Sequence, residues 1–340
     1  MSLPLARTAR QRAYPGTTMR RALPSPLPRR HGLEPAELRL PAGGDWATVL
    51  DYLHDRLPWA PSGRLEQMLD DGEVVDRDGP LGRLAPYRPG TSIWFHRDLP
   101  DEAPVPFEID VLHRDDDLLV VDKPHFLATI PRGRHVLQTA LVRLRTELDL
   151  PALSPAHRLD RITAGVVMFV VRPELRGAYQ SLFEHRQVRK VYEAVAPYDP
   201  RVELPVERAT RIVKERGVFA AAEVPGEPNS STRIELVEQR DGLGRYRLLP
   251  LTGRTHQLRL HMCAIGLPIL GDPLYPVVRD QAVDDWSRPL QLLARTLEFT
   301  DPVSGRPRRF ESRRSLRAWT DPAGWAEDPG VATATGLPIS

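Results

Sequence analysis

Apolar and polar residues follow two different periods along the chain. They alternate over 188–196, which is typical of a strand with one buried face. Residues 165–171 are apolar almost without interruption, and so short a run predicts a buried strand. A helical period occurs instead over 136–148, 173–183 and 252–265. These segments predict a chain in which helices and strands are mixed.

Predicted strands outnumber predicted helices from residue 107 onward. The acidic turn 114–117 lies between two short apolar segments and predicts a hairpin. Further strands are expected at 207–213, 218–223, 231–238, 244–250, 290–300 and 308–310. Because helices and strands do not alternate regularly, we expect an α+β fold with a mixed, mostly antiparallel β-sheet flanked by helices and loops.

Changes in composition predict how the chain is divided. Residues 1–33 hold seven arginines and no acid, together with several prolines, and indicate a disordered basic arm, either a solvated tail or an arm that binds a polyanion. A small α/β unit follows, whose first helix is expected to begin at Asp45. The expected parts are the arm at 1–40, the small unit at 45–98, a linker at 99–106, a large domain at 107–320 and a frayed tail at 321–340.

Composition excludes several classes of protein. The chain has 340 residues, a formal net charge of +2 and one cysteine, Cys263, so it holds neither an internal disulfide nor a thiolate metal cluster. Its longest apolar run, 166–171, is far shorter than the ~20 residues that span a bilayer. The N-terminus lacks a secretory apolar region. We expect a cytoplasmic monomer that does not enter a membrane.

Residues 157–161 read HRLDR and lie just before the predicted buried strand. The two arginines beside Asp160 favour its ionised form, and an ionised carboxylate suits a nucleophile better than a general acid. A structural ion pair at the entry of the strand explains the same pattern. The residues alone leave both interpretations open.

The segment TGRTHQLRLHM, 252–262, gathers several polar groups. Read as a helix, it brings Arg254, Gln257 and His261 near one another, and its first residues could bind a phosphate; a charged, solvated helix face is the alternative. His256 and His261 are five residues apart and point away from each other on a helix. They are therefore unsuited to one metal ion, and no metal site is expected.

A basic strand is predicted in RQVRKVYEA, 186–194. Lys190 and Tyr192 share one strand face, which suits phosphate contact together with base stacking. A solvated strand edge guarded by cations fits equally well. Lys123, at the end of the strand 118–121, is expected by itself to be a surface charge.

Together and in this order, these segments resemble one family. HRLDRITAG is similar to the HRLDxxTSG motif of the RluA-type RNA pseudouridine synthases. LLVVDKP, KVYEAV and LLARTLEF resemble other strands of that family, and LLPLTGRTHQLRLHMCAIGLPILGDPLYP resembles its arginine-containing helix with the loop beyond it. The resemblance covers 107–312. The unit 45–98 is similar to an S4-like RNA-binding module by a helix, Arg64 and Gly72-Glu73-Val74-Val75.

The resemblance implies an enzyme that isomerises uridine in structured RNA, either ribosomal or transfer RNA, to pseudouridine with no cofactor or metal. Asp160 matches the family's catalytic aspartate, which attacks the uridine at the ribose C1′ or at the base. Arg259 matches the arginine that pairs with this aspartate. Tyr192 matches the tyrosine that stacks on the flipped base and assists proton transfer. The implied RNA-binding residues are Arg158, Lys190, Arg254, His256 and Gln257.

Some positions depart from the family pattern. Ala164 replaces a serine, and Phe126 stands where a glycine is common, so the loop 124–132 is expected to follow a different path. The three catalytic positions are intact, which favours an active enzyme over the alternative, a catalytically silent RNA-binding protein that uses the same basic cleft. A glycosidic-bond hydrolase would need a second carboxyl at a set distance, and no obvious partner is present.

Overall fold

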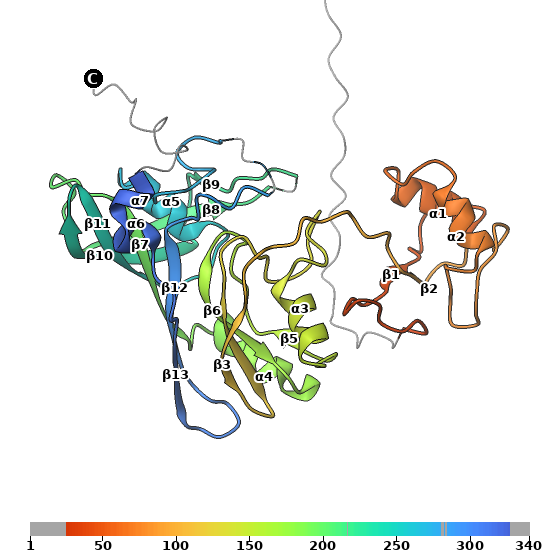
Figure 1. Cartoon of the computed structure of the whole chain (residues 1–340). Coiled ribbons are helices and arrows are strands. Elements are labelled where there is room, and N and C mark those ends of the chain that lie inside the picture. Colours follow the sequence, from red (N-terminus) through yellow and green to blue (C-terminus); the bar gives the residue numbers. More distant parts are fainter. Residues whose placement is uncertain (1–24, 216, 280–281, 283, 327–340) are drawn as a thin grey trace, which may run out of the picture. The chain divides into compact units, whose positions relative to one another are not determined.

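The computed structural model describes residues 25–215, 217–279, 282 and 284–326, which belong to two compact units that meet in the sequence at Arg97 and Asp98 (Figure 1). The elements of the first unit are β1 (Ala36–Arg39), α1 (Val49–Arg56), α2 (Arg64–Asp70) and β2 (Ser92–Phe95). Strands β1 and β2 form an antiparallel pair, and both helices bury apolar side chains in a core of their own.

Two predicted boundaries in the first unit are wrong. The basic arm does not extend to 40, because β1 pairs with β2 and Leu40 is buried in the core of the unit; residues 1–24 of that arm lie outside the described residues. Helix α1 begins after Thr48 and not at Asp45. The Thr48 side chain accepts from the Asp51 amide while the Asp51 carboxylate accepts from the Thr48 amide, a capping box that fixes the start of the helix.

An eleven-stranded sheet dominates the second unit, in the order β3-β4-β6-β12-β7-β11-β10-β8-β9, with β13 beside β12 and β5 beside β6. The strands are β3 (Asp110–Arg114), β4 (Leu118–Lys123), β5 (Ser154–Pro155), β6 (Ala164–Val170), β7 (Arg189–Pro197), β8 (Val206–Val213), β9 (Ala222–Val224), β10 (Ser230–Arg240), β11 (Leu243–Pro250), β12 (Leu292–Thr300) and β13 (Pro307–Glu311). The helices are α3 (Ala140–Glu147), η1 (Pro173–Leu175), α4 (Arg176–Glu184), α5 (Gln257–Ala264), α6 (Arg317–Thr320) and α7 (Pro322–Ala326).

The fold-class prediction is confirmed. Strands β6 and β12 pair in parallel over two residue pairs, and the other strand pairs of the sheet are antiparallel. Helices lie against this sheet (Figure 1). Among the described residues, no helix is long and apolar enough to cross a membrane.

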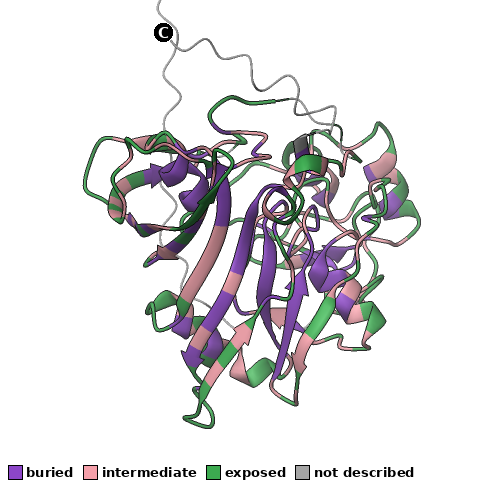
Figure 2. Cartoon of the chain, turned by 60° about the vertical axis from the view of Figure 1, so that its left-hand side comes forward, coloured by how far each residue is buried: buried purple, intermediate pink, exposed green. Residues whose placement is uncertain are grey.

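Strands of the large sheet are buried along much of their length (Figure 2), and β6 is one of these strands. Val167 and Phe169 point into the core that includes α3 and α5, while Met168 and Val170 pack with α4 on the other face. Because both faces are covered, all seven residues of β6 are buried, which accounts for its uninterrupted apolar sequence.

Two further boundaries differ from the prediction. The helix expected over 252–265 begins only at Gln257, because His256 has a left-handed backbone with φ 57°. Residues 322–326, expected in a frayed tail, form α7, where Trp325 is buried against the large unit. Residues 327–340 of that tail lie outside the described part of the chain.

Candidate active site

The loop that carries Asp160 joins β5 to β6 and is held at several backbone atoms. The Thr129 hydroxyl donates to the Leu159 carbonyl over 2.8 Å and accepts from the Leu159 amide over 3.1 Å. His125 Nδ1 lies 2.8 Å from the Ile162 carbonyl. The Thr163 amide donates to the carbonyl of Asp160 itself. These bonds immobilise the backbone on both sides of Asp160, as a positioned reactive group requires.

Three neighbouring strands bring Tyr192 toward this loop. Gly165, at the start of β6, pairs with Ala294 of β12, and Ala294 pairs with Tyr192 of β7. Gly165 has φ +115°, and a Cβ there would lie 2.3 Å from the Ala294 carbonyl oxygen. The glycine therefore allows a close approach of β6 to β12 that another residue would prevent. The charge of Asp160 acts on Tyr192 across this crossing: burial first, and then the Asp160 charge, raise the pKa of the Tyr192 phenol.

The Asp160 carboxylate has no hydrogen bond or ion pair to the described residues. Arg158 is exposed and Arg161 contacts the Phe126 ring and carbonyl, so neither neighbour forms the structural ion pair that the sequence allowed. The charge of Asp160 nevertheless acts on several groups of the site. Burial lowers the pKa of the Lys123 amine and of the His256 imidazole. Among the charges that act on these two groups, Asp160 has the largest effect, and it acts to raise both pKa values. The arrangement leaves a partly exposed carboxylate among cationic groups with its oxygens available.

Arg259 forms its ion pair with Asp272, and the expected direct pair with Asp160 is not present. Its Nε donates to Asp272 Oδ2 over 2.7 Å and its Nη2 to Oδ1 over 2.5 Å, and both side chains are almost fully buried. The amides of Leu274 and Tyr275 also donate to Asp272. Burial opposes the charge of Arg259, but the Asp272 bonds outweigh it and raise the pKa of the guanidinium. Asp160 is thus a more distant, unbonded partner whose charge raises that pKa further.

Lys123 is a site residue whose environment the sequence did not reveal. Far from being a surface charge, it is fully buried at the end of β4. Its Nζ donates to the carbonyls of Pro124, Leu127 and Arg161 over 3.0, 2.8 and 3.3 Å. Burial lowers the pKa of this amine to about 7. Three carbonyls from two loops converge on one lysine, which ties the loop after β4 to the loop of Asp160.

Phe126 adopts the backbone that a glycine would adopt at its position, with φ 65°. This conformation is strained for a bulky residue. The ring compensates by packing against Phe107 and Trp286 at centroid distances of 6.1 and 5.3 Å, with the Arg161 guanidinium over it at 5.9 Å. Arg161, whose role the sequence left open, therefore covers the aromatic cluster below the Asp160 loop.

Four of the five expected RNA-binding residues have groups near or at the surface. Arg158 and Arg254 are exposed, and Arg254 Nε donates to the Asn229 carbonyl. Lys190 Nζ donates to the Thr252 carbonyl over 3.2 Å. His256 Nδ1 lies 2.9 Å from the Tyr275 hydroxyl, and burial lowers the pKa of its imidazole to about 4.

Gln257 differs from the expectation, because it is 3 % exposed and faces the interior. Its Oε1 accepts from the Thr252 hydroxyl and the Arg254 amide, and its Nε2 donates to Ser231 and Thr232. Both donors and both lone pairs are thus used within the chain. The helix begins at Gln257, so this side chain holds the preceding loop and has no group left for RNA.

His261 is also buried. Its imidazole contacts the hydroxyls of Thr210, Ser230 and Thr232 at 2.9–3.2 Å. No group of three or more metal-ligating side chains occurs in the part of the chain that the structure describes.

Comparison with known proteins gives a consistent result. The family model described as "RNA pseudouridylate synthase" matches residues 117–264. An uncharacterized RNA pseudouridine synthase of Synechocystis is 31% identical over 228 residues, which cover 66% of this chain and 76% of the relative. The dual-specificity RNA pseudouridine synthase RluA of Escherichia coli K12 is 33% identical over 210 residues, 59% of this chain and 91% of that one. The solved structure of human RNA pseudouridylate synthase domain containing 4 aligns with a TM-score of 0.48 at 24% identity, over 61% of this chain and 88% of that chain.

Proposed function

The chain belongs to the RluA-type family of RNA pseudouridine synthases, and we propose that Asp160 is the nucleophile with which it isomerises uridine in RNA. The observation that carries this proposal is the position of the Asp160 carboxylate, fixed through its backbone, beside Tyr192 and Arg259, yet without a bonded partner in the described chain. A carboxylate without a bonded partner keeps its lone pairs for attack.

The reaction needs one group that attacks and others that stabilise charge. Asp160 adds to the uridine at the ribose C1′ or at the base, the bond from N1 to C1′ breaks, and the uracil turns. C5 then forms the new bond to C1′, the bond to Asp160 breaks and releases the carboxylate, the C5 proton is lost, and N1 carries a proton in the product. Atoms and charge balance without an oxidant, a reductant or a further substrate.

Arg259 and Lys123 contribute charge around the nucleophile. The buried pair with Asp272 keeps Arg259 ionised and fixed in position. A cation that is already oriented needs no reorganisation when the carboxylate gains or loses charge during the reaction. Lys123 titrates near pH 7 and holds the Asp160 loop through the Arg161 carbonyl.

Tyr192 supplies a flat, partly buried ring beside the carboxylate. Its raised pKa keeps the phenol protonated at neutral pH, so its hydroxyl is a hydrogen-bond donor in the resting enzyme. We assign it to stacking on the flipped uracil and to the later proton transfer. Arg158, Lys190, Arg254 and His256 are assigned to the RNA around that base, which we take to be structured ribosomal or transfer RNA.

The proposal is tested with Asp160→Asn, which keeps the shape of the side chain and removes its charge. Wild-type and variant protein are incubated with total RNA from cells that lack this protein, and the nucleosides are separated and quantified. We expect the variant to melt at the wild-type temperature, to retain RNA binding and to form no pseudouridine. Turnover by Asp160→Asn would exclude the carboxylate as nucleophile. A wild-type protein that binds RNA and forms no pseudouridine would instead favour the catalytically silent binding protein.

A further inference from the structure

The hairpin of β8 and β9 has a tip, described at residues 214–215 and 217–221, to which the mechanism above gives no role. Phe219 at this tip is 87 % exposed, and its neighbour Val218 is 48 % exposed. A benzyl side chain left in water contributes nothing to folding, although it offers a flat apolar surface to a partner. Two observations show that this tip is held beside the candidate active site.

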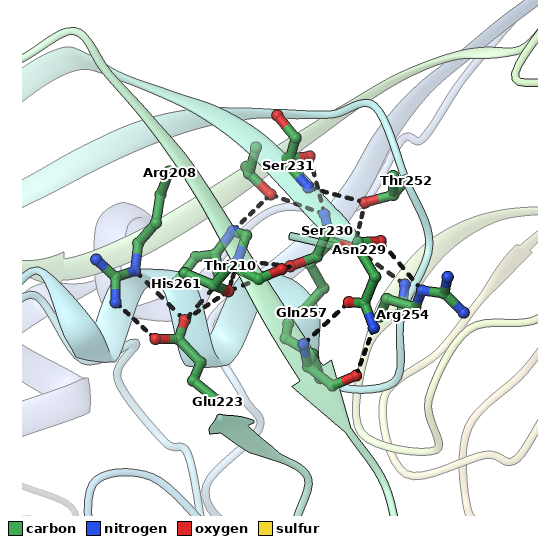
Figure 3. A network of polar contacts seen from close by, with 12 residues as sticks. Arg208, Thr210, Glu223, Asn229, Ser230, Ser231, Thr252, Arg254, Gln257 and His261 are labelled. Atoms are coloured by element: carbon green, nitrogen blue, oxygen red, sulfur yellow. Dashed lines mark hydrogen bonds and ion pairs between the residues drawn. The ribbon is translucent and has the colours of Figure 1, made fainter. Parts of the chain in front are cut away.

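The first observation is a polar network at the base of the hairpin (Figure 3). Glu223 of β9 accepts from Arg208 over 2.6 Å and from the Thr210 hydroxyl over 3.2 Å, both on β8. Thr210 Oγ1 lies 3.0 Å from His261 Nε2 of α5, and the other ring nitrogen, Nδ1, lies 2.9 Å from Thr232 Oγ1.

One arrangement of protons satisfies the network. Gln257 Nε2 donates to Thr232, whose hydroxyl then donates to His261 Nδ1. His261 donates from Nε2 to Thr210, whose hydroxyl donates to Glu223. The hairpin is therefore joined by a continuous chain of hydrogen bonds to the residue that starts α5, and its base is rigidly placed.

The second observation concerns the tip itself. The Tyr275 hydroxyl donates to the Ala221 carbonyl and accepts from the Ala221 amide, both over 2.8 Å. The same hydroxyl lies 2.9 Å from Nδ1 of His256, an imidazole on which the Asp160 charge acts. Phe219 is two residues from Ala221, so its Cα lies within about 7 Å of the Ala221 Cα. The exposed ring is thus carried by a segment that is bonded, through Tyr275, to His256 of the candidate site.

Two cationic side chains, Lys214 and Arg254, belong to the hairpin or are joined to it. Lys214 at the tip is close enough to His256 for its charge to lower the pKa of the imidazole. Arg254 donates to the Asn229 carbonyl, and the Asn229 amide side chain pairs with both backbone polar groups of Ile212 in β8. One exposed acid, Glu215, lies in the same tip. Cations next to an exposed aromatic ring are the composition of a surface that binds single-stranded nucleic acid.

We propose that Phe219 stacks on a base of the RNA strand that flanks the target uridine, with Lys214 and Arg254 on the adjacent phosphates. This inference rests on the proposed function, since it assigns the hairpin tip to the same RNA. A flipped uridine leaves its neighbours partly unstacked, and a ring held beside the entrance can take the place of the lost stacking partner.

The test compares Phe219→Ala and Phe219→Trp with wild type, and Val303→Ala is the control, because Val303 is an exposed apolar residue in the turn between β12 and β13. With total RNA from cells lacking the protein, we expect Phe219→Ala to raise KM about 10-fold with kcat within 2-fold of wild type. Phe219→Trp should restore KM, and Val303→Ala should not change it. An unchanged KM in Phe219→Ala, or a loss that the tryptophan does not restore, overturns the proposal.

A second measurement separates this inference from the proposed function. The Asp160→Asn protein is irradiated with a uridine octamer that contains 5-bromouridine, and the cross-linked peptides are identified by mass spectrometry. We expect a cross-link at Phe219 that the alanine variant lacks. A cross-link at Phe219, together with a wild-type protein that makes no pseudouridine, would leave the RNA contact standing and remove the enzymatic proposal. No cross-link, together with an active wild-type protein, would do the reverse.

Discussion

Arg259 and Asp272 form a two-point ion pair in the interior of the large unit, with N···O distances of 2.7 and 2.5 Å and almost no exposure of either side chain. The family resemblance had led us to expect that Arg259 would pair with Asp160 instead. Its effect is to fix a permanent cation near the nucleophile while the Asp160 carboxylate remains unbonded.

Asp272→Asn should therefore affect both stability and activity. The amide keeps the shape of the carboxylate but leaves Arg259 as a buried charge without its counterion, which costs about 3–5 kcal/mol of unfolding free energy. Urea unfolding measures this loss, and pseudouridine formation should fall with it. Asp199→Asn, which removes the partner of Arg201 on the surface, serves as the control and should leave the unfolding midpoint unchanged. Equal midpoints for Asp272→Asn and wild type would contradict this account of the pair.

Gly165→Ala should disrupt the crossing that brings Asp160 and Tyr192 together. The new Cβ would meet the Ala294 backbone at 2.3 Å in a backbone conformation that alanine rarely adopts. We expect a loss of about 3 kcal/mol or more of unfolding free energy. In Gly177→Ala the added methyl meets nothing within 4 Å on helix α4, and this variant should be at least as stable as wild type. If the two variants unfold at the same urea concentration, the close approach of β6 and β12 does not require a glycine at position 165.

The strands β6 and β7 could be predicted from the sequence, whereas part of the candidate site could not. The buried β6 and the alternating β7 are visible locally, because their periods depend on which faces are covered. The burial of Lys123 is not visible, since one of its acceptors lies 38 positions away in the sequence. A lysine that ends a strand looks the same in the sequence whether its amine reaches water or three carbonyls.

The helix containing Arg259 was predicted too long for a related reason. The segment was read as a helix from Thr252, but His256 takes a left-handed backbone and the Gln257 side chain bonds back to the loop. Read as a helix, the segment brought Gln257 and His261 near Arg254, and the family resemblance assigned Gln257 to RNA. In the structure both side chains are buried, where they contact hydroxyls of Thr232 in β10 and, for His261, of Thr210 in β8.

Acid should destabilise the protein through its buried imidazoles, of which His261 gives the clearest test. Burial lowers the pKa of His261 to about 4, so the unfolded chain binds a proton between pH 6.5 and 4 that the folded chain does not. The contribution of the neutral His261 to the free energy of unfolding is fully present above pH 6.5 and is lost as the pH falls. Between pH 6.5 and 5 this amounts to about 1.5 kcal/mol.

Urea unfolding at the two pH values measures this difference. We expect His261→Gln to be less stable than wild type at pH 6.5, because the hydroxyl groups around it lose the imidazole as a partner. On acidification to pH 5, however, the free energy of unfolding of the variant should fall by about 1.5 kcal/mol less than that of wild type. A variant at the exposed His185, His185→Gln, should keep the wild-type dependence on pH. An identical pH dependence in His261→Gln and wild type would show that the pKa of His261 is the same in the folded and the unfolded chain.

Tyr192→Phe separates the ring of this residue from its hydroxyl. The ring should still stack, so the affinity for RNA should stay within 2-fold of wild type. Loss of the phenolic proton should slow turnover about 100-fold, the size of effect typical of a positioned proton donor or acceptor. Single-turnover rates at saturating enzyme measure this step without interference from RNA release. A wild-type rate in Tyr192→Phe would remove the hydroxyl from the mechanism and leave stacking as the role of Tyr192.

The most direct test of the central claim, that Asp160 performs the isomerisation, is a map of pseudouridines in total RNA from cells with and without this protein. Cells lacking it are complemented with either the wild-type chain or Asp160→Asn at equal protein levels. We predict that one or more pseudouridines disappear in its absence, return with the wild type and do not return with Asp160→Asn. A map that is unchanged by loss of the protein, or one that Asp160→Asn restores, would contradict the assignment.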